Sequence, residues 1–161
     1  MSFLVKVIII LIVMAGVGVG VWLAAPLFYN KKVSEELPGV ESFPKSEAEN
    51  PVTVEPVALA EGLFQGADSF HQAAGTARLV ATDGKKYIRF EDDFTVTNGP
   101  DLFVYLGNNG QYDADTNLGR LKGNVGSQNY EVPAEIDVSQ YSEVWVWCRA
   151  FFVPFGHAVL Q

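Results

Sequence analysis

The sequence predicts an all-β fold, either an antiparallel β-sandwich or a small barrel, behind one N-terminal transmembrane helix. Three observations predict it. The run from Val7 to Ala25 contains no charge in 19 residues. After residue 60, short runs of β-branched and aromatic residues alternate with turn dipeptides. No stretch of this second part repeats its apolar residues with the period of an amphipathic helix.

The charge-free run has the length of a membrane anchor. A helix rises about 1.5 Å per residue, so 19 residues cross the roughly 30 Å hydrocarbon core of a bilayer. A cleavable signal peptide fits less well, because a cut after Ala25 leaves a leucine at the minus-three position and a proline after the cut. We therefore expect residues 1–30 to remain as an anchor. Gly16 and Gly20 form a G-x-x-x-G pair that could join two anchors as a homodimer.

The distribution of charge excludes some classes of partner, but it does not predict the orientation of the anchor in the membrane. Lys6 precedes the anchor and Lys31 with Lys32 follows it, so the positive-inside comparison is a tie. All 19 acidic residues and ten of the 11 basic residues follow the anchor, which gives this part a net charge of −9. Such a charge argues against nucleic acid and against an anionic membrane surface as partners.

Residues 31–60 form the predicted linker. Their composition shifts to Pro, Glu, Ser and Val, with prolines at positions 38, 44, 51 and 56. Proline fixes φ and lacks an amide donor, so we expect an extended, semi-rigid spacer that holds the domain away from the bilayer. A spacer suits a single-pass membrane protein whose C-terminal domain, residues 61–161, is extracytoplasmic.

The domain divides into predicted strands at its turn signals. Asp83-Gly84 between two strand-like runs predicts a hairpin. In Asn98-Gly99-Pro100-Asp101, the glycine permits an unusual φ and the proline fixes the next one, as a turn requires. Residues 137–141 have the composition of a single helical turn. The predicted strands are Thr76–Thr82, Lys86–Phe90, Leu102–Leu106, Asn129–Val132 and Glu143–Trp147.

Cys148 is the only cysteine, and it follows an aromatic, β-branched run. Alternate side chains of a strand share a face, which places Cys148 with Val144 and Val146, opposite Trp145, Trp147 and Arg149. One thiol cannot form an intrachain disulfide. In an extracytoplasmic domain it is therefore buried, ligated, reactive or paired with another chain. The residues alone leave open a small core hydrophobe and a redox group.

His71 and His157 complete the candidate metal ligands of the domain. Two imidazoles and one thiolate form the ligand set of a mononuclear copper electron-transfer centre, although Cys148 and His157 lie farther apart in sequence than such sites usually require. Haem is the second alternative, with Cys148 or His71 as an axial ligand. No C-x-x-C-H motif occurs, which excludes covalent c-type attachment. A bare thiol without a cofactor fits equally well.

The segment from Asp113 to Gly119 is similar to the start of a calcium-binding loop. It departs from that loop at the sixth position, Leu118, and at the twelfth, Asn124, where glycine and glutamate belong. A solvated hairpin loop is therefore the preferred prediction, with calcium as the alternative. No G-x-S-x-G, H-E-x-x-H or P-loop motif occurs, so we expect a redox or binding module rather than an enzyme with its own substrate.

An ordered series of motifs points to one family. The series is Gly62-Leu-Phe64, His71, Gly75-Thr-Ala77, Phe94-x-x-Thr97-Asn98-Gly99-Pro100-Asp101-Leu102-x-Val104-Tyr105-Leu106, Leu118-Gly119-x-Leu121-Lys122-Gly123-Asn124, Gln128-Asn129-Tyr130-x-Val132-Pro133 and Trp147-Cys148-x-x-Phe151-x-Val153-x-Phe155-Gly156-x-Ala158. It closely resembles the DM-thirteen domain family over nearly everything after Glu61. The Asn-Gly-Pro-Asp turn and the Trp-Cys-x-x-Phe strand are its most specific pieces.

This resemblance implies an extracytoplasmic β-rich module. In other proteins the module accompanies DOMON-type haem or sugar domains, and it is proposed to take part in electron transfer. The implied redox element is Cys148, beside Trp147, as a bare thiol or a haem ligand. His71 matches the family's histidine and Asp101 its acidic turn residue. We expect the electron partner to be another protein. The competing expectation is an adhesion or ligand-binding β module in which Cys148 is structural.

Overall fold

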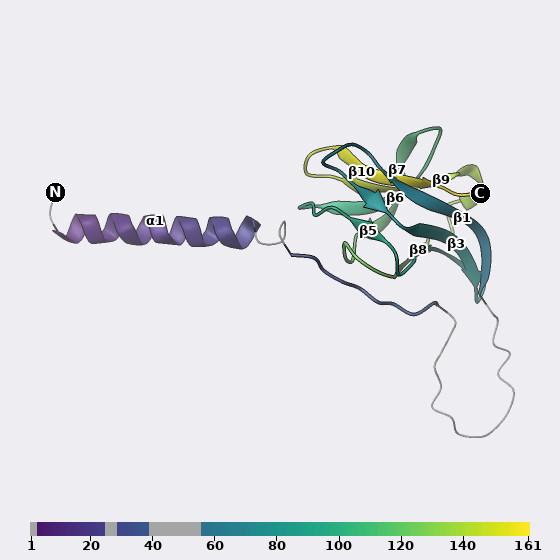
Figure 1. The fold of residues 1–161 in the computed structure, drawn as a ribbon, viewed down its shortest axis with the longest axis horizontal. Helices are drawn as coiled ribbons and strands as arrows, with labels where there is room; N and C mark the ends of the chain where they lie inside the picture. Colours follow the sequence, from purple (N-terminus) through teal and green to yellow (C-terminus); the bar gives the residue numbers. More distant parts are fainter. Residues whose placement is uncertain (1–2, 25–28, 39–55) are drawn as a thin grey trace, which may run out of the picture.

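The fold is described from a computed structural model of the 161-residue chain, in which residues 3–24, 29–38 and 56–161 are placed. The first segment is a helix, α1 (Phe3–Ala24), which extends away from a β-rich domain (Figure 1). Within the three described ranges, no helix meets the length and hydropathy that crossing a membrane requires. Most of the predicted linker, residues 39–55, lies outside these ranges.

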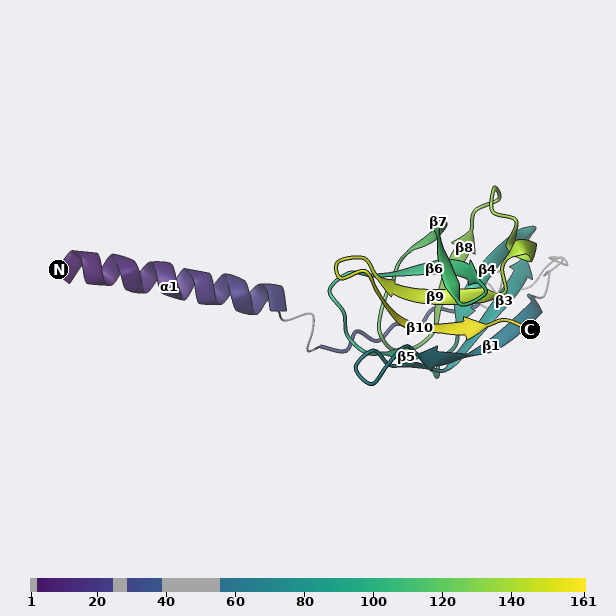
Figure 2. The same cartoon turned by 90° about the horizontal axis from the view of Figure 1, so that it is seen from above.

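An eight-stranded antiparallel sheet forms the domain, and it curls until it is nearly closed into a barrel (Figures 1 and 2). The strand order is β7-β6-β9-β10-β1-β3-β4-β8. The strands are β1 (Val57–Gly66), β3 (Thr76–Thr82), β4 (Lys85–Phe90), β6 (Leu102–Asn108), β7 (Gln111–Arg120), β8 (Gln128–Val132), β9 (Glu143–Cys148) and β10 (Val153–Val159), and the short β2 (Ala73–Ala74) and β5 (Thr95–Val96) pair separately. The predicted antiparallel β fold is confirmed.

The five predicted strands correspond to β3, β4, β6, β8 and β9. The predicted hairpin at Asp83-Gly84 joins β3 to β4, and both residues have positive φ, 50° and 74°, as a tight hairpin turn requires. The predicted helical turn is a short 3₁₀ helix at residues 138–140, which the side chain of Asp137 caps.

Three further long strands, β1, β7 and β10, were not predicted. Small residues and glycines dilute the β-rich pattern of β1, and Pro154 and Gly156 interrupt that of β10. The pairing of β10 with β9 shifts between these two residues, which accommodates the proline at an irregularity in the ladder.

The predicted loop at residues 113–119 is instead part of β7, so the loop prediction is wrong. This strand lies at one edge of the sheet and pairs only with β6, so its polar side chains face water. The register between the two strands shifts twice around Tyr105. Within this bulge, Thr116 Oγ1 accepts from the Leu106 amide at 2.8 Å and donates to the Leu106 carbonyl at 3.0 Å. A side chain thus replaces the missing ladder bonds.

A single apolar core fills the curled sheet. Its centre is a set of three rings from different segments, Phe64, Phe90 and Phe94, whose centroids lie 4.5 to 5.0 Å apart. Ile88 and Val146 join them with no exposed surface. Among the described residues, every buried side-chain nitrogen and oxygen has a hydrogen-bond partner. The core is therefore closed, and its buried polar side-chain groups are hydrogen-bonded.

Residues 29–38, which we call the strap, lie along the domain although they belong mostly to the predicted linker. The Val33 amide donates to the Val125 carbonyl at 2.9 Å, and the Glu35 amide donates to the Ser127 carbonyl at 3.0 Å. Lys32 forms a parallel bridge with Val125. The strap is thus attached to the loop that precedes β8.

The carboxylate of Glu35 makes the strongest contacts of the strap. Lys122 Nζ lies 2.8 Å from both of its oxygens, and the Asn129 amide donates to it at 2.8 Å. Burial raises the pKa of Glu35, but the bonds from Lys122 and Asn129 outweigh that effect and the pKa is lowered. Arg89 also donates to the Glu35 carbonyl at 3.2 Å. These contacts hold residues 29–38 against the domain.

Candidate functional site

Cys148 ends β9 and is fully buried in the core. Its backbone partners are Leu102 of β6 and Val153 of β10. Val144 and Val146 share its face of the sheet, as the alternation predicted, and both belong to the same core. Cys148 is absent from the lining of four cavities in the described part of the chain. The thiol is therefore enclosed by apolar side chains.

The opposite face of these strands carries a cluster of aromatic rings. Tyr112 stacks on Trp147 with centroids 4.1 Å apart, and Tyr105 meets Tyr112 at 5.2 Å. Trp145 stacks on His157 at 4.5 Å. We call these five residues the outer aromatic cluster. Trp147 belongs to it and therefore does not share a face with the Cys148 thiol.

His71 lies in the loop between β1 and β2, held by Asp68. Its Nδ1 is 2.7 Å from Asp68 Oδ2, and its ring packs on Phe155 at 4.5 Å. Asp68 Oδ1 also accepts from the amides of Phe70 and His71. The hydrogen bonds from the His71 side chain and from these amides lower the pKa of Asp68 to about 2. This network orients the imidazole against the edge of the core.

His157 lies on β10 and pairs with Trp145 across the sheet. It shares the outer face with Trp145, whereas Cys148 points into the core. In the part of the chain that the structure describes, no three His, Cys, Asp or Glu side chains are grouped to hold a metal ion. The three candidate copper ligands, Cys148, His71 and His157, are thus not brought together.

The Asn98 to Asp101 turn leads from β5 into β6. A Cβ atom at Gly99 would lie 2.7 Å from Leu102 Cδ2 and 2.8 Å from Phe155 Cζ. Gly99 is not among the glycines with positive φ, so the turn does not use the conformational freedom that glycine permits. Glycine lets the side chains of Phe155 and Leu102 pack directly against the turn.

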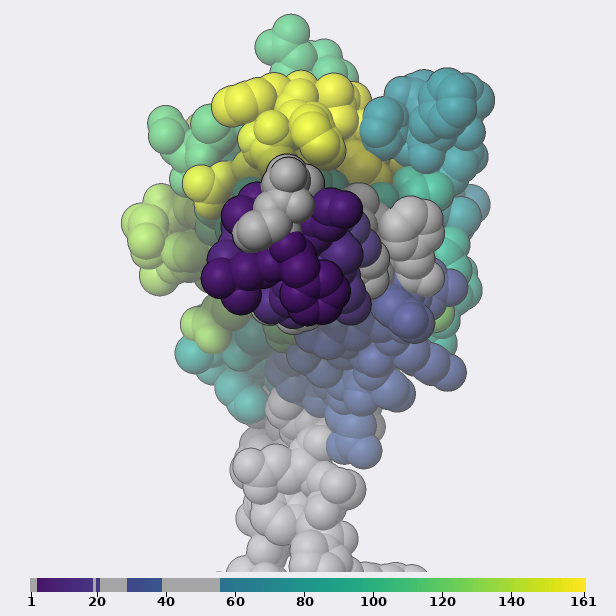
Figure 3. All heavy atoms as spheres, turned by 90° about the vertical axis from the view of Figure 1, so that its left-hand side faces the viewer, coloured from purple at the N-terminus to yellow at the C-terminus, as the bar shows by residue number. Residues whose placement is uncertain are grey.

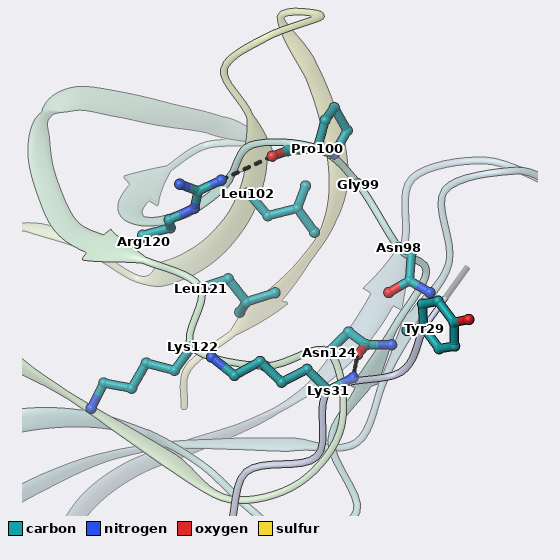
Figure 4. A pocket seen from close by; sticks show the side chains of 11 residues that line it. Tyr29, Lys31, Asn98, Gly99, Pro100, Leu102, Arg120, Leu121, Lys122 and Asn124 are labelled. Atoms are coloured by element: carbon teal, nitrogen blue, oxygen red, sulfur yellow. Dashed lines mark hydrogen bonds between the residues drawn. The ribbon is translucent and has the colours of Figure 1, made fainter. Parts of the chain in front are cut away.

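A cavity of about 540 Å³, the turn cavity, opens beside this turn (Figure 4). Its basic side chains are Lys31, Arg120 and Lys122, and no acidic residue is among the described residues that line it. Figure 4 shows Lys31 extending toward Leu121, while Lys122 points away from the cavity. Arg120 donates to the Pro100 carbonyl at 2.9 Å.

A smaller cavity of about 290 Å³ brings Asp101 and Trp147 together, with Arg149 and Phe152 beside them. The Asp101 carbonyl accepts from the Arg149 amide at 3.0 Å, and its carboxylate lies 3.5 Å from the Arg120 guanidinium. Asp101 thus ties the turn before β6 to the end of β9. These contacts join the start of β6 to the end of β9.

Comparison with protein families supplies the decisive observation. A family model described as "Electron transfer DM13" matches residues 64–160. The chain belongs to the DM13 family. Comparisons with curated proteins and with solved structures found no match. The matched segment of this DM13 chain includes Cys148, His71, Asp101 and Trp147, and the predicted family is confirmed.

Sequence reasoning missed several residues of these sites in the DM13 domain. Tyr105 was in a predicted strand, two positions after Phe103, so its place on the outer face could have been inferred from alternation. Tyr112 lies on the unpredicted strand β7. Lys31 and Arg120 meet at the turn cavity although they are far apart in sequence, and no local pattern could have paired them.

Proposed function

We propose that this DM13 domain takes part in electron transfer through reversible oxidation of the Cys148 thiol by a disulfide of another protein, its redox partner. The Cys148 thiolate would form a mixed disulfide with one partner sulfur while the partner's own disulfide breaks and its second sulfur leaves as a thiolate. The observation that carries the proposal is the "Electron transfer DM13" match over residues 64–160, a segment that contains the only thiol of the chain. Cys148 ends β9, a strand that is paired on both sides, with β6 and with β10.

A bare thiol fits the surroundings of Cys148 better than a cofactor does. A haem ligated by sulfur needs open space beside that sulfur, and the described side chains enclose it completely. A copper centre needs both imidazoles near the thiolate, and His157 lies on the opposite face of the sheet. Neither group fits this arrangement.

Burial also limits how the thiol reacts. In thiol–disulfide exchange the attacking and attacked sulfur atoms must meet, so a partner can reach Cys148 only when the β9–β10 hairpin opens locally. Access would then be controlled by the domain itself. In an oxidising compartment, this burial would protect the single thiol from uncontrolled oxidation.

We further propose that residues 1–30 anchor the chain in a membrane as a single-pass segment and that the DM13 domain is extracytoplasmic. The support is the charge-free run from Val7 to Ala25, whose 19 residues match the thickness of a bilayer core. Retention of the full chain in vesicles after a carbonate wash tests the anchor. Protection of the domain from added protease tests on which side of the membrane the domain lies.

A second candidate function is a ligand-binding or adhesion module in which Cys148 is only a core residue. The complete burial of Cys148 favours it, because small buried thiols commonly serve as core hydrophobes. The turn cavity of about 540 Å³ provides space for a small ligand. The two candidates differ in whether Cys148 changes its oxidation state.

The test uses the full chain from cells supplied with haem, with Cys148→Ala as the control, because the strap contributes to the domain. Its absorption spectrum is recorded before and after addition of copper, and oxidation of Cys148 is followed by mass spectrometry across glutathione redox buffers. We expect no visible band in either protein and reversible oxidation of Cys148. A visible absorption band that is present in the unmodified chain and lost in the Cys148→Ala variant would show instead that Cys148 ligates a cofactor. A thiol that stays reduced at every potential would support the binding module.

A further inference from the structure

Four exposed aromatic residues lie in segments at one end of the DM13 domain. Tyr29 is 74% exposed, Phe70 82%, Phe151 67% and Phe152 76%. They belong to the start of the strap, the β1–β2 loop and the β9–β10 hairpin. Exposed rings do not stabilise the core, so their grouping needs an explanation outside the domain.

Direct contacts join these three segments. The Ala67 amide of the β1–β2 loop donates to the Phe155 carbonyl behind the hairpin at 3.3 Å. The Asn98 side chain donates to Asn30 Oδ1 at 3.3 Å, which joins the strap to the turn before β6. That turn is bonded to Arg149 at the base of the hairpin. Figure 3, which views the domain from the side of α1, shows the yellow hairpin and the blue-green loop on the face toward the viewer.

Phe152 is held in a conformation that its side chain disfavours. Its φ is 56°, in the left-handed region where glycine is favoured and a bulky residue is strained. A glycine would relieve the strain at this hairpin tip. A phenylalanine that is both strained and exposed is consistent with a ring that is used for contact with another body.

The chain connection places this end close to the end of α1. The strap is bonded to the domain from residue 30 onward, and only four residues separate Ala24 from Tyr29. The five Cα–Cα steps from Ala24 to Tyr29 span at most about 18 Å even when fully extended. The surface from which the helix emerges therefore lies close to Tyr29 and to this end of the domain.

Two acidic residues at this end, Asp68 and Asp101, contact His71 and Arg120, and other basic residues remain that can contact lipid phosphate. Lys31, Lys32 and Arg149 are exposed, and none forms a salt bridge with a described residue. Lys31 also lines the turn cavity, which lacks acidic lining residues in the described part of the chain. Aromatic rings with basic neighbours are the composition that settles at the interface between headgroups and acyl chains.

We propose that this end of the domain docks on the phospholipid bilayer that holds its own anchor. Phe151 and Phe152 enter the interface, with Phe70 and Tyr29 at its rim, while Lys31 and its basic neighbours contact lipid phosphates. The inference rests on the anchor proposed above. It replaces the spacer expected from the sequence with a domain that lies on the membrane.

The experiment places the isotope-labelled full chain in phosphatidylcholine nanodiscs that contain a gadolinium-chelating lipid. We expect strong broadening of the backbone amide signals of residues 30–32, 68–71 and 149–152. The hairpin at Asp83-Gly84, near the opposite end of the strands, serves as the internal control. The double variant Phe151→Ser with Phe152→Ser should lower the docked population roughly tenfold, because two buried rings are lost. Val57→Ser with Leu59→Ser removes exposed apolar groups elsewhere and should change nothing.

The possible outcomes test the anchor proposal and the docking proposal separately. Loss of the chain from the nanodiscs after a carbonate wash would overturn both proposals. If the chain is retained but gadolinium broadens the amide signals at both ends of the domain equally, the docking alone is overturned. Slow hydrogen exchange of residues 149–152 without gadolinium broadening would assign the rings to a second protein and also overturn lipid docking. Unchanged thermal melting of the double variant confirms that its domain is folded.

Discussion

At the scale of single residues, the burial of Cys148 makes its substitutions informative. Cys148→Ala removes a sulfur from the closed core and should cost about 1 kcal/mol of unfolding free energy. Cys148→Ser leaves a hydroxyl without an obvious partner among apolar side chains and should cost more, about 1–3 kcal/mol. Urea unfolding of the three proteins measures both values. Equal stability of the serine and alanine variants would mean that water reaches the site and hydrogen-bonds the serine hydroxyl.

The Asp68 carboxylate provides a second test at this scale. Its pKa of about 2 is below the ordinary value of about 3.9, because His71 and two amides bond to its charged form. A lowered folded pKa stabilises the β1–β2 loop above about pH 4, and this contribution is lost as the pH falls toward 2. Carbon-detected NMR titration of Asp68 measures the pKa directly. A titration near pH 4 would show that the bond to His71 is absent in solution.

At the scale of elements, the strap depends on the Glu35 carboxylate. Glu35→Gln removes the ion pair with Lys122 and should weaken strap attachment by about 1 kcal/mol, a modest value because the pair is partly exposed. Glu36→Gln is the matched control, since the structure assigns a contact only to the backbone carbonyl of Glu36. Hydrogen exchange of the Val33 and Glu35 amides reports attachment. Similar exchange in both variants would contradict the assigned role of the carboxylate.

The β-turns provide a matched pair of glycines. Gly75 has a φ of 102°, and a Cβ there would lie 2.5 Å from Phe94 Cα. Gly84 has a φ of 74° but open space around it. Gly84→Ala should therefore cost only the backbone strain, about 1 kcal/mol, whereas Gly75→Ala should cost roughly 3 kcal/mol or more. Thermal melting compares the two, and equal shifts would show that the close approach at Gly75 relaxes easily.

At the scale of the whole molecule, the strap acts as part of the domain. A chain that starts at residue 29 keeps its bonds to the loop before β8, and one that starts at residue 39 loses them. We expect the shorter chain to be less stable by roughly 2–5 kcal/mol, because several bonds of about 1 kcal/mol disappear together. Urea unfolding of the two truncated chains gives the difference. Equal midpoints and slopes would show that the strap does not contribute to stability.

The family and most central strands could be predicted because their signals are local. Alternation in Val144 to Cys148 placed the thiol on the same face as Val144 and Val146, and Asp83-Gly84 marked a hairpin that the structure contains. The strand β7 could not be found in this way. Its polar residues resemble those of a loop, and only pairing with β6 and the bonds of Thr116 make it a strand.

The sequence by itself determined the β class, the DM13 family and the residues that share a face with Cys148, since each follows from residue order over short distances. Only the tertiary structure decided that His157 and Cys148 lie on opposite faces of the sheet. It also decided that the strap lies on the domain and that Lys31 reaches the turn cavity. These features depend on contacts between segments far apart in the chain, and curling of the sheet, which no local pattern records, brings those segments together.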